Sequence, residues 1–536
     1  MTSTAAADLI FGLTRVVGLP ALTEAAGAPL GAGDIAQIVT EADRFCAEVL
    51  LPGAQAADRQ GAVYANGVVT TPYREAYGKW IAGGWQSLAA PAEHGGQGLP
   101  AALWTAMVEL GMAADASFML GPLLTAGAID CLCHHATEDQ AARWLPRMVS
   151  GHWTGAMCLT EPNAGSDLGV LRCRAEPLGD GRYALHGQKI YITWGEHDCT
   201  ENILYLVLAR LPDAPPGSKG ISLFACTKVK QDGTRNALRC GGIERKMGIH
   251  ASPTCVMLFD GAEAEMVGEP HRGLPAMFAM MNNARLGVGT QGVAHGAAAL
   301  RLAEAHAAQR VQGGRTIAEH PDVARMLMEM RSVTLAGRLL ALETALCVDR
   351  HALLGDAAAQ NRLALLTPIL KAWCTDRGVE TASTGIQVHG GMGYIEDAGA
   401  AQVLRDARIA PIYEGTNGIQ AIDLLVRKVA KDGGAEMRAL IGEVKRLPDA
   451  RLRAAADALL AATEAVLDAQ GRDAAAAQSV AVPYLEAAGW VLGGWMLARA
   501  AAADTAAYGP VADFYLRRLL PRGAGRVAEI AGALAA

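Results

Sequence analysis

The amino-acid sequence predicts a mainly α-helical protein with a central β domain. Apolar side chains recur at helical spacing within residues 34–150 and again from residue 274 onward. Between these regions, short β-branched and aromatic runs are bounded by Gly, Pro and Asp. We therefore expect helices, then strands, then helices, then an appended helical unit, at residues 1–150, 151–268, 269–432 and 433–536.

The N-terminal region is predicted to be helical because two apolar stripes flank one loop. The loop, residues 89–100, is punctuated by Gly and Pro. The stripes consist of Ile35, Ile38, Val39, Ala42 and Phe45 before the loop, and of Leu103, Met107, Leu110 and Met112 after it.

The β domain is predicted from four short runs rich in β-branched or aromatic residues. They lie at residues 190–193, 203–208, 221–224 and 256–259. Their short lengths and their turn residues predict a compact β domain that begins near residue 153.

The helical period that returns at residue 274 predicts a bundle. Its breaks fall near Gly313-Gly314, Leu354-Gly355 and Gly390-Gly391, and long amphipathic segments with short connections are typical of antiparallel helices. After Gly433-Gly434 comes an Ala-rich helical region, in which Trp490 and Trp495 supply apolar material for a further core.

Composition restricts the classes of function. The 536 residues carry a formal net charge of -7, so nothing indicates a nucleic-acid partner. Eleven scattered Cys residues without a CxxC pair fit a reducing compartment. One cluster, residues 131–135, holds two Cys and two His, but no second ligand group lies at finger-like spacing, so we expect no metal.

The termini and the apolar runs predict a cytoplasmic protein. No Lys or Arg precedes Arg15, which argues against a signal peptide. We find no uninterrupted apolar stretch of about 20 residues, so we expect no stable membrane insertion.

One glycine motif resembles a dinucleotide-binding fingerprint, but the residues around it argue against that function. Residues 287–292 match GxGxxG, which in nucleotide-binding proteins follows a strand and opens a βαβ unit. Here the preceding residues 277–285 have helical character, and no alternation of strands and helices follows. We therefore predict a helix whose small residues allow a neighbour to pack closely.

A single carboxylate stands out in residues 408–420. Glu414 lies between an apolar stretch and a Gly-Thr-Asn-Gly turn, where apolar neighbours raise a carboxyl pKa toward the value needed by a base near neutral pH. Gly415 allows close approach of a ligand, and Thr416 or Asn417 can cap the following helix. Taken alone, the segment is more simply a surface loop with an ordinary Glu.

Three further segments add polar or flat groups to loops and strand ends. Residues 158–167 combine Thr, Asn, Gly, Ser and Asp, which suit a ring edge or a phosphate. Residues 188–195 form a strand with an aromatic and a hydroxyl group, and residues 387–394 form a glycine turn. Each is a weak signal by itself.

In this order, together with the Gly-Gly-Gln-Gly-Leu-Pro loop at residues 95–100, these segments resemble the acyl-CoA dehydrogenase family of flavoproteins. The resemblance implies an N-terminal helical domain, a middle antiparallel β-barrel-like domain and a C-terminal four-helix bundle. The extra C-terminal helical region departs from the shortest members. Within it, residues 511–521 resemble the tail of the larger bacterial branch that includes 3-methylmercaptopropionyl-CoA dehydrogenase.

The resemblance implies FAD as the cofactor, held between the β domain and the C-terminal bundle. It also implies that Arg310 and Gln312 reach the FAD of a neighbouring subunit, so a homo-oligomer, most simply a dimer, is expected. The cofactor-binding residues that it assigns are Met157, Leu159, Thr160, Ser166, Tyr191, Ile192, Thr193, Arg310, Gln312, Gln387, Gly390, Gly391 and Thr416.

The resemblance makes Glu414 the catalytic base. Some members place the base immediately before the residue that matches Arg285, but Ala284 occupies that position here. The substrate-binding residues that it assigns are Ser166, Asn282, Arg285 and Gly415. Because a buried cation opposes a rise in the pKa of Glu414, we expect its tuning to be a balance.

The activity implied is oxidation of an acyl-CoA thioester to a trans-2-enoyl-CoA, as in β-oxidation. Glu414 would remove the α-proton, its backbone N–H and a ribityl hydroxyl of FAD would bind the carbonyl, and electrons would pass to an electron-transfer flavoprotein. The substrate candidates are 3-methylmercaptopropionyl-CoA and short or medium acyl-CoAs. Two alternatives are an acyl-CoA oxidase that uses oxygen and a non-catalytic member that acts as a binding protein.

Overall fold

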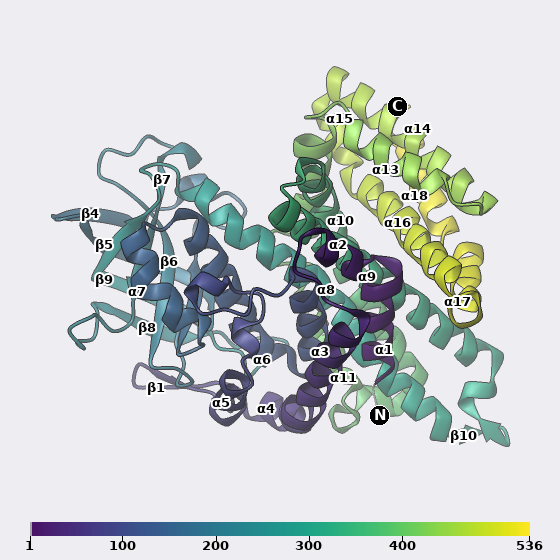
Figure 1. Cartoon of the computed structure of the whole chain (residues 1–536), viewed down its shortest axis with the longest axis horizontal. Coiled ribbons are helices and arrows are strands. Elements are labelled where there is room, and N and C mark those ends of the chain that lie inside the picture. Colours follow the sequence, from purple (N-terminus) through teal and green to yellow (C-terminus); the bar gives the residue numbers. More distant parts are fainter. Residues whose placement is uncertain (1–2, 536) are drawn as a thin grey trace. The chain divides into compact units, whose positions relative to one another are not determined.

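The computed structural model describes residues 3–535, and its helices and strands form two compact units (Figure 1). The helical unit takes in Met1–Phe45, Pro100–Ala113 and Arg285–Ala536, within the described limits. The β unit takes in Cys46–Leu99 and Ala114–Ala284. The boundaries between the units fall inside two long helices, α6 (Ala101–His135) and α8 (Gly273–Gln309).

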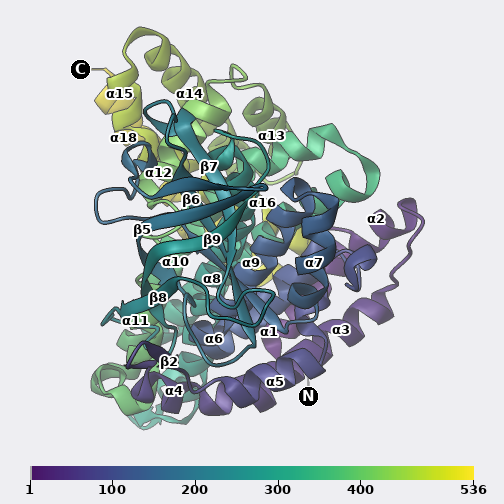
Figure 2. The ribbon, with the colours of Figure 1, turned by 90° about the vertical axis from the view of Figure 1, so that its left-hand side faces the viewer.

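The β unit is built on a seven-stranded sheet that closes on itself. Its order is β3-β6-β4-β5-β9-β7, with β7 also paired to β6 and β8 paired to β9 (Figure 2). The β3–β6 and β4–β6 pairs are parallel and the others are antiparallel. The bounds are β3 (Trp153–Cys158), β4 (Arg174–Gly179), β5 (Arg182–Thr193), β6 (Asn202–Arg210), β7 (Ile221–Thr227), β8 (Leu238–Ile243) and β9 (Thr254–Val267).

All four predicted runs are confirmed as parts of strands, namely of β5, β6, β7 and β9. The continuous apolar run of β6 is explained by its position, because β6 pairs with β3, β4 and β7 and is buried along nearly its whole length. Strands β3, β4 and β8 carry weaker patterns and were not predicted individually.

Helices and a hairpin complete the β unit. They are α4 (Ala54–Gln60), β1 (Val63–Ala65), β2 (Val68–Thr70), α5 (Arg74–Ala82), α7 (Glu138–Val149) and the C-terminal part of α6. A capping box formed by Thr137 and Gln140 starts α7. Trp144 and Leu145 of α7 share a core with Leu206 of β6, so α7 covers one face of the sheet.

The long, apolar helix α6 is kinked at one residue. Asp115 has a non-helical conformation, with φ -154° and ψ 97°. Among the described residues, α6 alone is long and apolar enough by itself to cross a membrane, and 83% of its apolar window is buried in the protein, which is typical of a core helix. The bent pair Thr4–Val16 and Leu19–Ala25 passes the same test only when it is counted as one span.

The helical unit is organised around three long helices, α8, α9 (Pro321–Leu354) and α10 (Ala357–His389). The predicted breaks are confirmed. Gly313-Gly314 turns a small hairpin of β10 (Val311–Gln312) and β11 (Arg315–Thr316), and Gly355 ends α9 in the left-handed region. Gly390 ends α10, and two short helices follow, α11 (Ala400–Ala407) and α12 (Asn417–Ile422), the second of which continues as a π-helix at Asp423–Val429.

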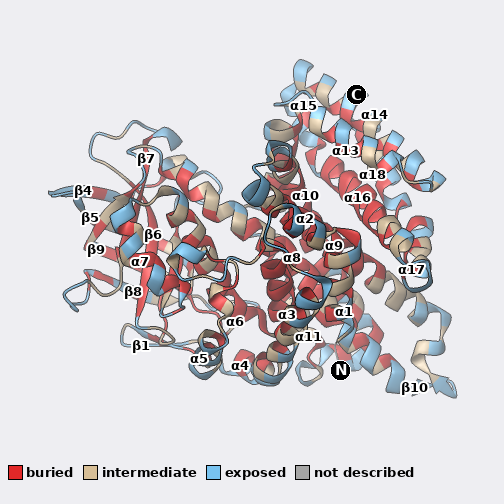
Figure 3. Cartoon of the chain, viewed as in Figure 1, coloured by how far each residue is buried: buried red, intermediate tan, exposed pale blue. Residues whose placement is uncertain are grey.

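The chain ends pack into the same helical unit. At the N-terminus these elements are α1 (Thr4–Phe11), a π-helical turn (Gly12–Val16), α2 (Leu19–Ala25) and α3 (Ala32–Phe45). The appended region forms α13 (Ala435–Lys445), α14 (Ala450–Arg472), α15 (Ala474–Ser479), α16 (Ala481–Ala503), α17 (Thr505–Arg518) and α18 (Pro521–Leu534). Figure 3 shows α16 buried along most of its length, with the helices around it exposed on their outer faces.

Candidate active site

The predicted base lies in a short loop between α11 and α12. Glu414 has φ +56°, a left-handed conformation that is costly for a side chain of its kind. Gly415 follows with φ +86°, and the Thr416 hydroxyl accepts a hydrogen bond from the Ile419 N–H at 3.3 Å. Of the two predicted caps, Thr416 is therefore the one that starts α12.

Three side chains hold two consecutive carbonyls of this loop. The Glu414 carbonyl accepts hydrogen bonds from Arg285 Nε at 3.3 Å and from Gln420 Nε2 at 3.2 Å. The Gly415 carbonyl accepts one from Lys371 Nζ at 2.8 Å. Because α8, α10 and α12 all contribute a donor, the strained conformation at Glu414 is fixed by its surroundings.

The electrostatic environment of Glu414 is a balance, as predicted. Burial raises the pKa of this half-buried carboxyl from 4.5 to about 7, and the cations Arg285 and Lys371 act in the opposite direction. Arg285 is itself buried, which lowers its pKa, and it faces Asp423 at 4.0 Å. A carboxylate whose pKa lies near neutrality is suited to general-base catalysis.

The loop also presents backbone donors. Within the described part of the chain, the N–H groups of Glu414 and Gly415 donate to no protein acceptor. Both residues are only partly exposed. A carbonyl oxygen placed beside Glu414 could therefore accept a backbone hydrogen bond next to the base.

The residue before the base is anchored on α8. The Tyr413 hydroxyl donates to Gln291 Oε1, and Gln291 Nε2 lies 3.2 Å from Nε2 of the buried His295. Gln291 belongs to the GxGxxG match, which is confirmed as helix. A Cβ atom on Gly292 would lie 2.4 Å from the Cys374 carbonyl oxygen of α10, so this glycine serves close helix packing.

Sequence reasoning missed two residues of this site. Lys371 of α10 is fully buried and also donates to Asn417 Oδ1 at 2.9 Å. The sequence does contain a sign of its importance, because Lys371 is the one charged residue among the apolar and hydroxyl-bearing residues 363–374. Asn417 was considered only as a cap, yet its side chain ties the loop to α10 through three donated hydrogen bonds.

The remaining predicted residues of the helical unit lie at the ends of its long helices. Arg310 and Gln312 are exposed at the β10 hairpin, where α8 gives way to α9 (Figure 1). Arg310 forms no ion pair with any described residue. Gln387, Gly390 and Gly391 are exposed where α10 ends, and Gly390 has φ +62°.

In the β unit, a buried ion pair shapes the predicted cofactor loop. Glu161 accepts hydrogen bonds from the N–H groups of Arg172 and Cys173, and from Lys189 Nζ at 2.9 Å. The fully buried Lys189 also donates to the Leu159 carbonyl at 2.9 Å. The segment that contains Met157, Leu159, Thr160 and Ser166 is thereby tied to β5, with Met157 and Thr160 partly exposed and Ser166 exposed.

A β-bulge turns a second predicted segment outward. Between Lys189 and Ile192, β5 carries one more residue than β9, and Tyr191 has φ +61° with 60% of its surface exposed. Ile192 is buried and Thr193 is half-buried. On α8, Asn282 is exposed and Ala284, which occupies the alternative base position, is buried.

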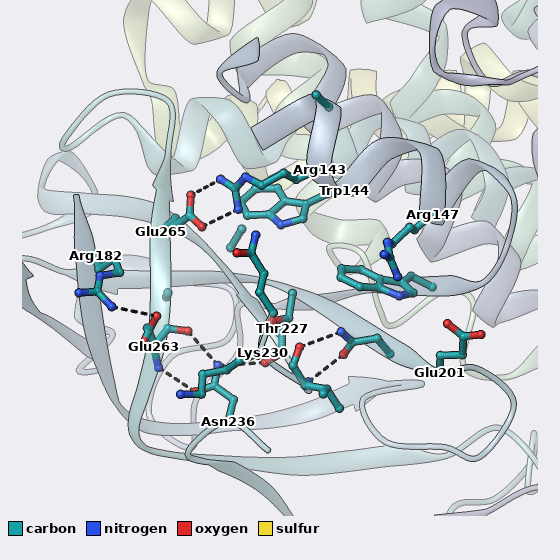
Figure 4. Close-up of a pocket in the computed structure, with 17 residues that line it drawn as sticks. Arg143, Trp144, Arg147, Arg182, Glu201, Thr227, Lys230, Asn236, Glu263 and Glu265 are labelled. Atoms are coloured by element: carbon teal, nitrogen blue, oxygen red, sulfur yellow. Dashed lines mark hydrogen bonds and ion pairs between the residues drawn. The ribbon is translucent and has the colours of Figure 1, made fainter. Parts of the chain in front are cut away.

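A separate cavity of about 780 Å³ lies between α7 and strands β5, β7 and β9 (Figure 4). Four of its charged side chains form ion pairs: Arg143 pairs with Glu265 at 2.7 Å and Arg182 with Glu263 at 3.4 Å. None of the predicted site residues lines it.

Four family models match the chain in sequence order. They are described as the N-terminal domain (residues 34–152), the middle domain (156–262) and the C-terminal domain (271–429) of acyl-CoA dehydrogenase, and as acetyl-CoA dehydrogenase C-terminal like (434–535). The last of these models matches the appended helical region that was predicted at residues 433–536.

Similar proteins agree with these matches. A 3-methylmercaptopropionyl-CoA dehydrogenase from Ruegeria pomeroyi is 45% identical over 88% of this chain and 86% of its own. Among solved structures, Caenorhabditis elegans ACDH-11 in complex with C11-CoA has a TM-score of 0.79 at 22% identity, covering 95% of this chain and 90% of that one. A Bacillus anthracis acyl-CoA dehydrogenase complexed with FAD has a TM-score of 0.79 at 20% identity, covering 94% and 88%.

The family-model matches span most of the sequence, and the 45% identical relative is matched over most of its own length. The predicted arrangement of helical and β domains is also confirmed by the structure. The chain belongs to the acyl-CoA dehydrogenase family of oxidoreductases.

Proposed function

We propose that the protein oxidises an acyl-CoA thioester to a trans-2-enoyl-CoA, with Glu414 as the base that removes the α-proton. The observation that carries this proposal is the half-buried Glu414 carboxyl, whose pKa of about 7 allows it to accept a proton near neutrality. The neighbouring backbone N–H groups would bind the thioester carbonyl and stabilise the charge that develops there.

FAD is the proposed cofactor, and when bound it supplies the acceptor for the β-hydrogen as hydride. The residues present suit such a group. In the β unit, the outward-facing Tyr191 offers a flat aromatic surface, and Thr160 and Ser166 offer hydroxyl groups on a loop fixed by the Glu161–Lys189 pair. The similar protein from Bacillus anthracis was solved with FAD.

In the helical unit, the exposed Arg310 provides a cation suited to a pyrophosphate, and Gln312, Gln387, Gly390, Gly391 and Thr416 provide further polar or close-approach positions. Because Arg310 and Gln312 match residues that reach a neighbouring subunit's cofactor in the family, we propose a homodimer.

The proposed substrate is 3-methylmercaptopropionyl-CoA or a short to medium acyl-CoA. The name of the 45% identical relative supports the first, and the C11-CoA complex of ACDH-11 supports binding of an acyl-CoA. Ser166, Asn282, Arg285 and Gly415 are proposed to line the substrate path. We further propose a cytoplasmic location and transfer of electrons to an electron-transfer flavoprotein.

The decisive experiment compares the wild type with Glu414→Gln. After reconstitution with FAD, anaerobic bleaching of flavin absorbance is followed with 3-methylmercaptopropionyl-CoA, butyryl-CoA and a medium acyl-CoA. We expect the variant to retain FAD and to lose activity by about 10²–10⁴-fold, because a positioned base contributes that much. A matched control is Glu464→Gln, which removes an exposed carboxylate on α14.

The outcomes separate the alternatives. Equal bleaching in the wild type and Glu414→Gln would contradict the assignment of the base. Peroxide release in air at the rate of substrate oxidation would identify an oxidase. A wild type that binds an acyl-CoA without any bleaching would identify a binding protein instead.

A further inference from the structure

We propose that Lys371 is a positioning residue for the base: its buried ammonium group fixes the Gly415 carbonyl and the Asn417 side chain, and its charge favours the carboxylate form of Glu414. This inference rests on the proposed function, in which Glu414 is the base. It adds a residue to which neither the sequence motifs nor the family resemblance assigned a role.

The first observation is an unusual burial. Lys371 has 0% exposed surface, and within the described residues it forms no ion pair with a carboxylate. Both acceptors of its hydrogen bonds are neutral, the Gly415 carbonyl at 2.8 Å and Asn417 Oδ1 at 2.9 Å. Because an ammonium group is costly to bury, its burial against the Gly415 carbonyl requires a compensating negative charge close by.

The second observation is that the Asn417 amide has only one orientation available. Its Nδ2 donates to the Ala372 carbonyl at 3.1 Å, to Thr375 Oγ1 at 3.0 Å and to Asp376 Oδ1 at 2.8 Å. Its Oδ1 must therefore point to Lys371. The ammonium group thus links α10 to Gly415, directly after the base, and to Asn417, the first residue of α12.

The third observation is electrostatic coupling between Lys371 and Glu414. Burial lowers the pKa of Lys371, while Glu414 and then Asp376 raise it and Arg285 lowers it. In turn, Arg285 and Lys371 lower the pKa of Glu414. Further charges lie one step away: Arg377 and then Glu486 of α16 act on Asp376, and Asp423 faces Arg285, Arg427 and Lys428.

The two cations near Glu414 therefore differ in their surroundings. Arg285 has a carboxylate, Asp423, at 4.0 Å, which it shares with Arg427 at 3.5 Å and Lys428 at 3.9 Å. Lys371 has no carboxylate within ion-pair distance among residues 3–535, so more of its charge is available to Glu414. A lysine that only capped carbonyls would affect stability and would leave the titration of the base unchanged.

The test measures kcat/KM as a function of pH for the wild type, Lys371→Met and Lys371→Gln. The Met variant loses both donor and charge, whereas the Gln variant keeps a donor for the Gly415 carbonyl. Because Lys371 lowers the pKa of Glu414, its removal should move the acidic limb of the profile upward by about one pH unit in both variants. On the alkaline plateau, Lys371→Met should be about 10²-fold less active, and Lys371→Gln should lose less, because misplacement of a reacting group carries a cost of this size.

Flavin content and thermal unfolding are measured in parallel, and Lys445→Met, at an exposed lysine on α13, is the control that should shift neither the limb nor the plateau. An acidic limb that stays in place in both Lys371 variants would overturn the proposal, even if their activity falls. Should Lys371→Met fail to retain flavin, the limb of Lys371→Gln decides alone.

These outcomes are distinguishable from failure of the proposed function. The proposed function, and this inference with it, would be refuted if none of the tested acyl-CoAs bleached the flavin of the wild type. Equal bleaching rates in the wild type and Glu414→Gln would refute both as well. An active wild type, an inactive Glu414→Gln and unshifted Lys371 variants would refute the role of Lys371 alone.

Discussion

At the scale of single residues, the site depends on opposing effects at one carboxyl group. Burial alone would hold Glu414 protonated to higher pH, and the cations Arg285 and Lys371 limit that rise. The pKa of about 7 is the result, and it places both protonation states within reach near neutrality.

This balance predicts the pH dependence of the wild type. The base must be ionised to accept a proton, so kcat/KM should rise about tenfold per pH unit below pH about 7 and level off above it. Initial rates of flavin bleaching at limiting substrate, from pH 5.5 to 9, would measure the limb. A limb near 4.5, the ordinary value of a Glu, would show that burial does not act on the base as described.

Arg310 carries a second prediction at this scale. An exposed arginine without an ion pair among the described residues has no structural task in the isolated chain. Arg310→Ala should therefore leave thermal unfolding of the FAD-free protein unchanged and weaken FAD retention, measured as bound flavin after gel filtration. Arg315→Ala, in the same hairpin, is the matched control. Undiminished flavin in Arg310→Ala would contradict a role at the pyrophosphate.

Sequence reasoning could propose site residues where a motif concentrates polar groups in one segment, and it could not do so where the partner is distant in the chain. Glu414, Gly415 and Thr416 are adjacent, so their pattern could be recognised. Lys371 lies 44 residues from the Gly415 carbonyl that it binds, so no short sequence motif could predict this contact. Its only local signal was a charge within an apolar helix.

At the scale of elements, the position of the site depends on how closely α8 and α10 approach. Gly292 of α8 and Gly378 of α10 face each other reciprocally: a Cβ on either would lie 2.4 Å from a backbone carbonyl oxygen of the other helix. This approach places Lys371 of α10 and Arg285 of α8 around one loop. The sequence predicted tight packing from the small residues, but it could not say which helix supplies the neighbour.

The close contact between α8 and α10 predicts that a Gly→Ala substitution has opposite effects on stability at a packed and at an exposed helix position. Gly292→Ala should destabilise the protein by about 1–3 kcal/mol, because the added methyl group meets backbone rather than a flexible side chain. Gly442→Ala, at an exposed position of α13 with nothing within 4 Å, should stabilise it by up to about 1 kcal/mol, since Ala favours helix over Gly. Thermal unfolding of both variants checks the pair, and a loss in Gly442→Ala as large as that in Gly292→Ala would refute the packing argument.

At the scale of the whole molecule, segments that are far apart in the sequence belong to the same compact unit. The sequence places residues 3–45 at one end and the appended region at the other, yet both belong to the helical unit. The four predicted segments remain a prediction of domain boundaries. The unit boundaries lie inside α6, beside its kink at Asp115, and inside α8, and the apolar spacing of the sequence marks no boundary at either position.

A buried charge network joins these distant parts of the helical unit. Arg338 of α9 donates to Glu109 Oε1 of α6 at 2.7 Å and to Asp8 Oδ2 of α1 at 2.8 Å. Asp8 also accepts from the Tyr508 hydroxyl of α17 at 3.1 Å, and Arg331 pairs with it as well. Asp8, Glu109 and Arg338 are each at most 3% exposed at their side chains, so their charges depend on one another.

Removing the central cation should therefore loosen the two ends of the chain together. Arg338→Met leaves Asp8 and Glu109 buried with less compensation, which should cost about 3–5 kcal/mol. Hydrogen exchange of the variant should show faster exchange in peptides from both α1 and α17, although the two helices are about as far apart in sequence as any pair in the chain. Arg517→Met, which breaks an exposed pair on α17, should leave α1 unchanged. Faster exchange confined to α9 in Arg338→Met would show that the appended region is held independently of the N-terminal helix, and that the network is not what integrates it into the helical unit.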